Sequence, residues 1–482
     1  MSRSELTRSV ATAFALLVFG VAVVGSGVGL ARADDFHIDS DTAFQAYEVR
    51  SPGTAVFMAR RRLLQTLALT WSRPVAEPAV GDEPTPRVAA SLRLRLDQDF
   101  GQTCLIDRDY CARATESGAR GSYQPLASDT DVDAPEAWVE LRGLPAAGRL
   151  RLGRHLSFGP AGMLRLDGAS GHVAPSAWLS FQAFGGAVVR QTSLAGGVGT
   201  FEPQGIVRRD LDDGVSPERV PWIDEPTTTW AAGGTVSLGH ARYLQARVGY
   251  RHILEDAGNV AATGALTLTS NPVPAFSVTA RGVWDFIGAG VQDAQAEVTV
   301  APHETLSFRA RAEHHVPRFD YGSIWMYFDL VPITEGLLSA TFHPTRRFEV
   351  GVGARARYAS LGAQGEEQDV GFEGHGLFRA LGFDVALSGS TWGGDLGPVA
   401  SVLVDIQRPI VWWARLDARA SVWHFDDPLR EGLYGTSVAE ALGVIFTLSE
   451  PTTLRLDFEH SYNRVAGNRF RFIAHLSVDV WR

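Results

Sequence analysis

The sequence predicts an all-β fold, a transmembrane antiparallel up-and-down β-barrel of about 20 strands, within a range of roughly 18 to 22. Long stretches alternate strictly between apolar and charged side chains, for about 8 to 12 residues each, whereas strands of soluble proteins usually run for about 5 to 6. Short turns alternate along the chain with connections of very different lengths. Helical periodicity is scarce, and the 50 glycines and 24 prolines interrupt the chain often.

Each predicted strand has one apolar and one ionised face. The segment "LRLDFEH" (454–460) sets Leu454 and Phe458 against Asp457, because successive side chains of a strand point to opposite faces. A strand of about 10 residues, tilted by roughly 40°, spans about 25 Å, the height of the apolar band of a membrane barrel. Backbone groups in hydrocarbon must all be paired, so we expect the sheet to close.

Counting from Val88 gives about 20 strands, and residues 41–72 add up to two more. The turns expected to be tight lie at 144–148, 184–186, 239–241, 271–274, 301–304, 343–346, 407–409 and 449–452. The connections expected to be long and variable are 101–134, 159–174, 195–227, 316–334, 360–368 and 426–433. Residues 436–448 have an ambiguous face assignment, so we expect a bulge or a change of register there.

The amino terminus has the pattern of a secretory signal. Arg3 and Arg8 precede an apolar run, and "ARA" at 31–33 resembles a cleavage site. We therefore expect residues 1–33 to be a cleaved signal peptide and 61–482 to form the barrel. Residues 34–60 are expected to be either its first strand or a small plug.

The charge balance argues against binding to nucleic acid, which requires a basic surface. Without residues 1–33 the net charge is about −12. The chain contains no lysine, so all 44 basic residues are arginines, as in proteins encoded by GC-rich genomes. Selection for the planar guanidinium is the alternative explanation.

The final segment, "RFRFIAHLSVDVWR" (469–482), resembles the last strand of Gram-negative outer-membrane porins, which alternates in this way and ends in an aromatic residue. Here Trp481 is penultimate and Arg482 takes the end position. The segment "VELRGLPAAGRLRLGRHLSFG" (139–159) is similar to a strand-turn-strand unit with a Leu-Gly-Arg motif in large porin families. The resemblance covers residues 88–482 as a pattern.

This resemblance implies a porin-like channel in the cell outer membrane, for passive diffusion of small hydrophilic solutes or ions. Its partners would be outer-membrane lipid and the outer-membrane assembly machinery, and no cofactor is expected. The alternative is a non-conducting structural or loop-mediated binding barrel with a plugged lumen. Neither the solute nor the oligomeric state follows from the sequence.

If the apolar faces meet lipid, the ionised faces line an aqueous bore. The residues expected to line the pore are Arg93, Arg95, Arg309, Arg311, Glu313, Arg355, Arg357, Arg415, Asp417, Arg419, Arg455, Asp457, Glu459 and Arg471. They would tune solute preference, or they would only pair across strands and keep the lumen wet. The loop at 205–226 is a candidate constriction, or a solvated rim, and carries Arg208, Arg209, Asp210, Asp212 and Asp213.

Other chemistry has weaker support. Cys104 and Cys111 predict a local disulfide rather than a metal site, because zinc would need two more ligands. No serine stands at a spacing that predicts contact with His314 or His460, so we expect no enzyme. Tryptophans near strand ends predict an aromatic girdle, with a sugar-stacking path as the alternative: Trp284, Trp392, Trp412 and Trp423.

Overall fold

The fold is described from a computed structural model. It describes residues 35–50, 57–75, 86–104, 129–189, 229–240, 242–255, 258–316, 331–360, 365–395, 397–426, 434–463 and 467–481. Within these ranges no helix is long and apolar enough to cross a membrane.

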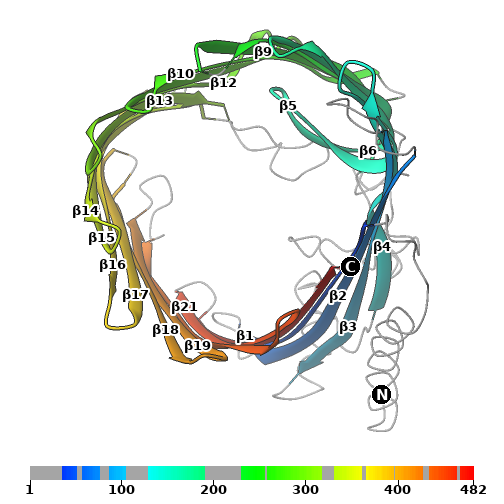
Figure 1. The fold of residues 1–482 in the computed structure, drawn as a ribbon. Helices are drawn as coiled ribbons and strands as arrows, with labels where there is room; N and C mark the ends of the chain where they lie inside the picture. Colours follow the sequence, from blue (N-terminus) through cyan, green and yellow to red (C-terminus); the bar gives the residue numbers. More distant parts are fainter. Residues whose placement is uncertain are drawn as a thin grey trace, which may run out of the picture.

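The described residues form one closed antiparallel sheet of 22 strands (Figure 1). The first eleven strands are β1 (Asp35–Arg50), β2 (Phe57–Pro74), β3 (Arg87–Cys104), β4 (Asp129–Leu144), β5 (Gly148–Gly159), β6 (Gly162–Ser176), β7 (Leu179–Val188), β8 (Trp230–His240), β9 (Leu244–Glu255), β10 (Gly258–Val273) and β11 (Phe276–Asp285). The remaining strands are β12 (Gly290–His303), β13 (Leu306–His315), β14 (Ile333–Thr345), β15 (Phe348–Ser360), β16 (Glu366–Ala380), β17 (Phe383–Gly394), β18 (Val399–Val411), β19 (Ala414–Asp426), β20 (Tyr434–Ser449), β21 (Thr452–Asn463) and β22 (Gly467–Trp481).

The barrel closes between its first and last strands. Strand β1 pairs with β2 on one side and with β22 on the other, from His37 opposite Trp481 to Glu48 opposite Phe470. Residues 35–50 therefore belong to the wall. The barrel has 22 strands rather than about 20, at the upper limit of the expected range. Strands β3 to β22 begin at Arg87, close to Val88, and β1 and β2 supply the other two.

Three predicted connections are strands in the structure. Most of residues 159–174, expected to be a long connection, lies in β6, the glycines at 185 and 186 lie inside β7, and the turn expected at 407–409 lies inside β18. The mixture of Gly, Ser, His and Pro in β6 hides its alternation. The bulge or change of register expected within 436–448 is found at the end of that segment, where β20 shifts against β21 between Thr447 and Ser449, whereas β20 pairs with β19 without interruption.

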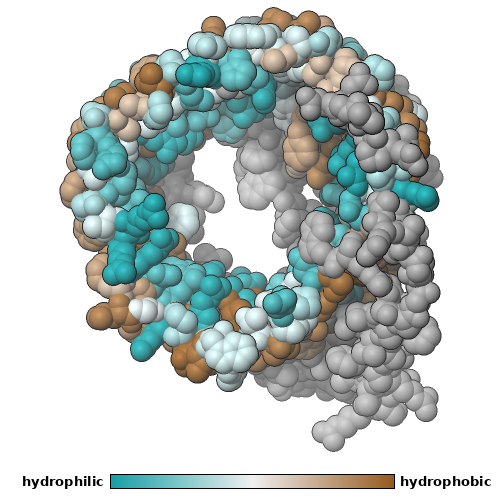
Figure 2. All heavy atoms as spheres, in the orientation of Figure 1, coloured by the Kyte–Doolittle hydropathy of each residue, from teal (hydrophilic) through white to brown (hydrophobic). Residues whose placement is uncertain are grey.

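The apolar face of the sheet is more exposed than the charged face. On β21, 52% of Phe458 is exposed, whereas its neighbour Asp457 is 6% exposed. Figure 2 shows hydrophilic residues around the inside of the ring and hydrophobic residues around its outside. The barrel is thus polar on its inner face and apolar on its outer face, the reverse of a water-soluble domain.

Candidate channel lining and constriction

The inner face of β18 to β21 carries a chain of ion pairs. Arg419 donates from Nε to Asp405 at 2.8 Å and from Nη2 to Asp417 at 3.0 Å. Arg455 lies 3.1 Å from the same Asp417 carboxylate and donates to Asp457 at 2.7 Å. Asp417, only 3% exposed, is therefore held between two guanidinium groups.

A second group of pairs lines β12 to β16. Arg309 pairs with Glu297, and Arg311 pairs with Glu313. Arg355 donates to Glu373 at 2.8 Å and lies 3.5 Å from Glu335. Arg357 donates from Nε to the buried Asp369 at 2.7 Å. Each pair joins neighbouring strands or positions two residues apart on one strand, so alternation brings the partners to one face.

The other predicted lining residues also have positions in the described barrel. Arg95 pairs with the buried Asp133, and Arg93 lies 4.0 Å from Glu136. Arg471 donates to Glu459 at 2.6 Å. Arg415 has no ion pair with another described residue.

Sequence reasoning missed several members of this inner network. Arg62 on β2 forms a buried pair with Asp97 on β3, which alternation already places in phase with Arg93 and Arg95. Glu140, 2% exposed, accepts from Arg151 at 2.8 Å and also pairs with Arg142. Their strands, "FMARRRLLQTLALTWSRP" and "DTDVDAPEAWVELRGL", interrupt the alternation, so their inner faces were not evident.

The seam between β1 and β22 has reciprocal contacts of its own. His37 on β1 bonds to Asp479 on β22 at 2.7 Å, and His475 on β22 bonds to Asp41 on β1. Each strand therefore supplies one histidine and one carboxylate, which joins the two ends of the chain on the inner face.

The β5–β6 hairpin leaves the wall and enters the lumen (Figure 1). Strand β5 pairs with β4 only up to Arg154, and β6 pairs with β7 only from Leu166 onward. Between these points, residues 155–164 pair only within the hairpin, up to Gly159 opposite Gly162, and the carbonyl of Arg165 accepts a hydrogen bond from Val189 at 2.9 Å. This half of the hairpin is therefore free to turn inward.

A row of paired glycines marks the bend. Gly153 on β5 lies opposite Gly168 on β6, which lies opposite Gly186 on β7. Gly153 has a φ of 110°, and a Cβ at Gly168 would come within 2.1 Å of the carbonyl oxygen of Gly185. Only glycine permits this close backbone approach. The glycine of the Leu-Gly-Arg motif is thus a member of the bend.

The tip of the hairpin rests on the inner wall at β9 and β11, a few strands along the ring from its root. The guanidinium of Arg281 on β11 donates to the carbonyl of Pro160 at 3.5 Å. A Cβ at Gly249 on β9 would lie 3.0 Å from the ring of Pro160, and one at Gly162 would lie 3.1 Å from Arg251. The hairpin therefore lies inside the lumen, from its root between β4 and β7 to the inner wall at β9 and β11.

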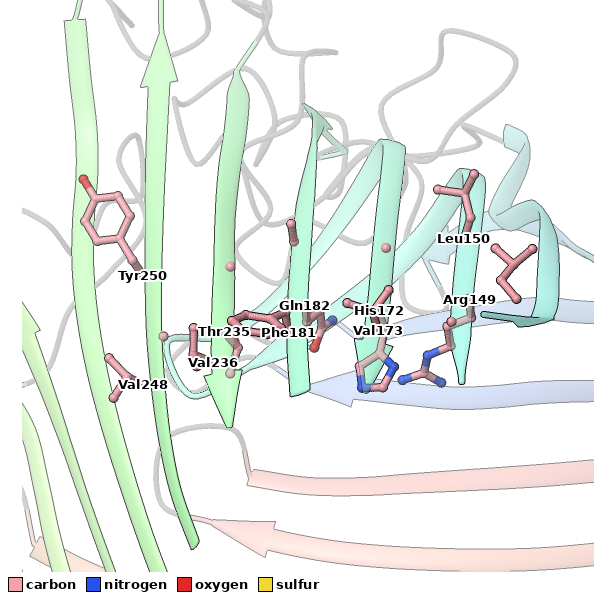
Figure 3. Close-up of a pocket in the computed structure, with 16 residues that line it drawn as sticks. Arg149, Leu150, His172, Val173, Phe181, Gln182, Thr235, Val236, Val248 and Tyr250 are labelled. Atoms are coloured by element: carbon pink, nitrogen blue, oxygen red, sulfur yellow. The ribbon is translucent and has the colours of Figure 1, made fainter. Parts of the chain in front are cut away.

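A depression of about 690 Å³ lies at the root of this hairpin (Figure 3). Phe181, Val236 and Val248 supply apolar side chains to it, and Arg149 lies beside His172 at one end. Most of the lining comes from the apolar face of β5 to β9. The depression is therefore separate from the charged bore.

Two tryptophans expected in an outer girdle lie on the inner face. Trp392 is directly opposite Gly371, next to Arg355 in the ladder, and Trp423 is in phase with Arg419. Trp284 lies on the outer face of β11, and Trp412 lies in the turn between β18 and β19. The girdle expected from these four residues is therefore correct for two at most.

Other predictions fall outside the described residues. These are the signal peptide, the constriction loop at 205–226 with its Arg and Asp cluster, and the pairing of Cys104 with Cys111. In the described ranges no group of three or more His, Cys, Asp or Glu is placed to hold a metal ion.

His314 contacts the hydroxyl of Thr334 at 2.9 Å, and His460 contacts Asn468 at 3.1 Å. Spacing along the chain did not reveal these cross-strand contacts.

Comparison with known proteins gives similarity in solved structures alone. No family model and no curated protein matches the chain. OccK7 (OpdD) of Pseudomonas aeruginosa is 9% identical over 93% of this chain and 99% of that chain, with a TM-score of 0.45. A BenF-like porin of Pseudomonas fluorescens Pf-5 is 10% identical over 94% of this chain and 100% of that chain, with a TM-score of 0.44. P. aeruginosa OpdQ is 8% identical over 94% of this chain and 100% of that chain, with a TM-score of 0.43.

Proposed function

We propose that this protein is an outer-membrane channel for passive diffusion of small hydrophilic solutes or ions. The observation that carries the proposal is the closed sheet with an apolar outside and an ionised inside. Hydrocarbon suits the exposed face that includes Phe458, and water suits the paired charges such as Asp417 and Arg455.

The size of the ring supports an aqueous bore. A closed sheet of 22 strands tilted by roughly 40° has a backbone diameter of roughly 40 Å, too wide for side chains alone to fill. The β5–β6 hairpin supplies a constriction within it. In this proposal the arginines and carboxylates of the inner face set ion and solute preference.

A plugged, non-conducting barrel is the second candidate, because some outer-membrane transporters with 22 strands hold a plug in the lumen. Residues 35–50 would be the obvious plug, but their pairing with both β2 and β22 favours a wall strand. The channel proposal also includes removal of residues 1–33 as a signal peptide and recognition of β22 by the assembly machinery.

Single-channel recording tests the proposal. Protein refolded in detergent and added to a planar bilayer should give stepwise ion conductance. Replacing potassium or chloride with a larger ion then gives the selectivity. Folded protein that inserts but passes no current would contradict the channel and support the plugged barrel.

A further inference from the structure

Trp423 has an unusual position on the inner wall. It lies on β19 in phase with Arg419 and Asp417, whose ion pairs fix the inner face of that strand. Pairing with β18 and β20 continues without a shift from Arg415 to Phe425. The indole therefore points into the lumen, three residues before β19 ends at Asp426.

The indole of Trp423 is also uncovered, unlike that of Trp392, which lies on the inner face as well. Trp423 is 57% exposed, whereas Trp392 is 7% exposed and lies beneath the guanidinium groups of Arg355 and Arg357, at 4.1 and 4.6 Å. A large aromatic surface exposed to water inside an otherwise charged bore is unfavourable unless a ligand covers it.

The two residues directly opposite Trp423 carry uncharged hydroxyls, and the next residue of β18 on the same face is the apolar Leu403. Ser401 on β18 and Ser437 on β20 lie directly opposite Trp423, one on each side. Ser421 is two residues away on the same face, and Ser390 lies 2.9 Å from Ser401 between their hydroxyl oxygens. The guanidinium of Arg419, four residues away on the same face of β19, is already paired with two carboxylates.

This combination matches one chemical class of solute. A sugar ring has an apolar C–H face that stacks on an indole, and an edge of hydroxyls that both donate and accept hydrogen bonds, as serines do. A carboxylate solute would instead require an unpaired arginine. We propose that Trp423, with Ser401, Ser421 and Ser437, forms a saccharide-stacking site inside the bore, near its loop-side end. This inference rests on the channel proposed above.

Current block by a sugar tests the site. The probe is maltotriose, added to the full-length protein in a planar bilayer, and the readout is the concentration that halves the ion current. We expect Trp423→Ala to raise that concentration about tenfold or more while the current without sugar is retained. Trp423→Phe should recover part of the block, and Ser437→Ala should weaken it less than Trp423→Ala does.

Trp412→Ala is the matched control, because this tryptophan is 91% exposed at the other end of the same strand pair. Its block by maltotriose should equal that of the wild type. Equal block in wild type and Trp423→Ala would overturn the site, as would block by benzoate without block by maltotriose.

The two proposals fail separately. A conducting wild-type protein that maltotriose does not block overturns the site and leaves the channel intact. If the folded protein does not conduct, the channel fails, and the site is then judged by maltotriose binding in detergent, measured calorimetrically. Binding by the wild type that Trp423→Ala loses supports the site, and no binding by the wild type overturns it.

Discussion

At the scale of single residues, the inner wall is a ladder of compensated charges. Carboxylates such as Asp417 and Asp457 are nearly inaccessible, while the arginines that pair with them keep part of their surface in the bore. The guanidinium is suited to this task because its planar fork reaches two carboxylates at once. Solute preference then depends on which charges are left uncompensated.

Replacing Asp417 with Asn should shift the channel toward anions. The substitution leaves Arg419 and Arg455 with one fewer compensating carboxylate, so positive potential in the bore rises. We expect the chloride-to-potassium permeability ratio to increase on the order of twofold, measured from the reversal potential in a KCl gradient. Glu450→Gln, in the exposed β20–β21 turn, removes the same charge outside the wall and should have little effect.

The buried pair of Arg62 and Asp97 should matter for stability. Arg62→Ala leaves a buried carboxylate without this partner, which costs about 3 to 5 kcal/mol of unfolding free energy. The double variant Arg62→Met, Asp97→Leu should recover most of it, because matched apolar groups replace the pair. Urea unfolding in lipid vesicles measures both. A double variant as unstable as Arg62→Ala would contradict this account.

Alternation alone located much of the inner face at this scale. It identified Arg309, Arg355 and Asp457 because their strands alternate without a break. The same rule places Trp423 with Arg419 and Ser421, so its inward direction was available from the sequence. What alternation did not provide is the partner of each charge, since this depends on the stagger between strands and on bulges such as the one opposite Arg93 and Arg95.

At the scale of elements, the β5–β6 hairpin is the most distinctive feature. The half of the hairpin near its tip does not pair with the neighbouring wall strands. It instead contacts Arg281 on β11 and Arg251 on β9. The sequence did not predict this, because β6 contains Gly168, Gly171 and Pro175 and was assigned to a loop. The inward bend depends on three glycines that lie side by side on neighbouring strands. This pairing is known only from the structure.

Shortening this hairpin should widen the channel. Replacing residues 156–165 with a two-residue Asn-Gly turn keeps the part of β5 and β6 that pairs with the wall. We expect single-channel conductance to increase by about twofold or more, because the described element that crosses the bore is removed. Retention of the compact form on unheated gels shows that the variant is folded. Unchanged conductance in folded protein would mean that the narrowest point lies elsewhere.

At the scale of the whole molecule, the barrel is a ring that needs every strand. Its overall class was predictable, because alternating strands of this length leave few architectures other than a closed barrel. The number of strands was less predictable, since β1 and β2 contain polar positions such as Ser40, Thr42 and Gln65 on the face opposite the charges. These side chains hydrogen bond to one another, which offsets the cost of facing an apolar medium.

Deleting residues 35–50 tests whether they form a strand of the wall or a plug in the lumen. Loss of β1 leaves β2 and β22 with unpaired edges, so we expect no compact form on unheated gels and no conductance. A plug would give the opposite result, a folded barrel with increased conductance. Deleting residues 155–164, the part of the hairpin that does not pair with the wall, is the control for removing a segment, and it removes fewer residues than the deletion of 35–50.

The contact between His37 and Asp479 joins residues 442 positions apart in the chain. This bond cannot form until the carboxyl-terminal strand has been made. Until then the sheet has two open edges, which can pair with other chains. We therefore expect incomplete intermediates of this protein to aggregate unless their open edges are shielded. The ring can close only when both ends of the chain are present.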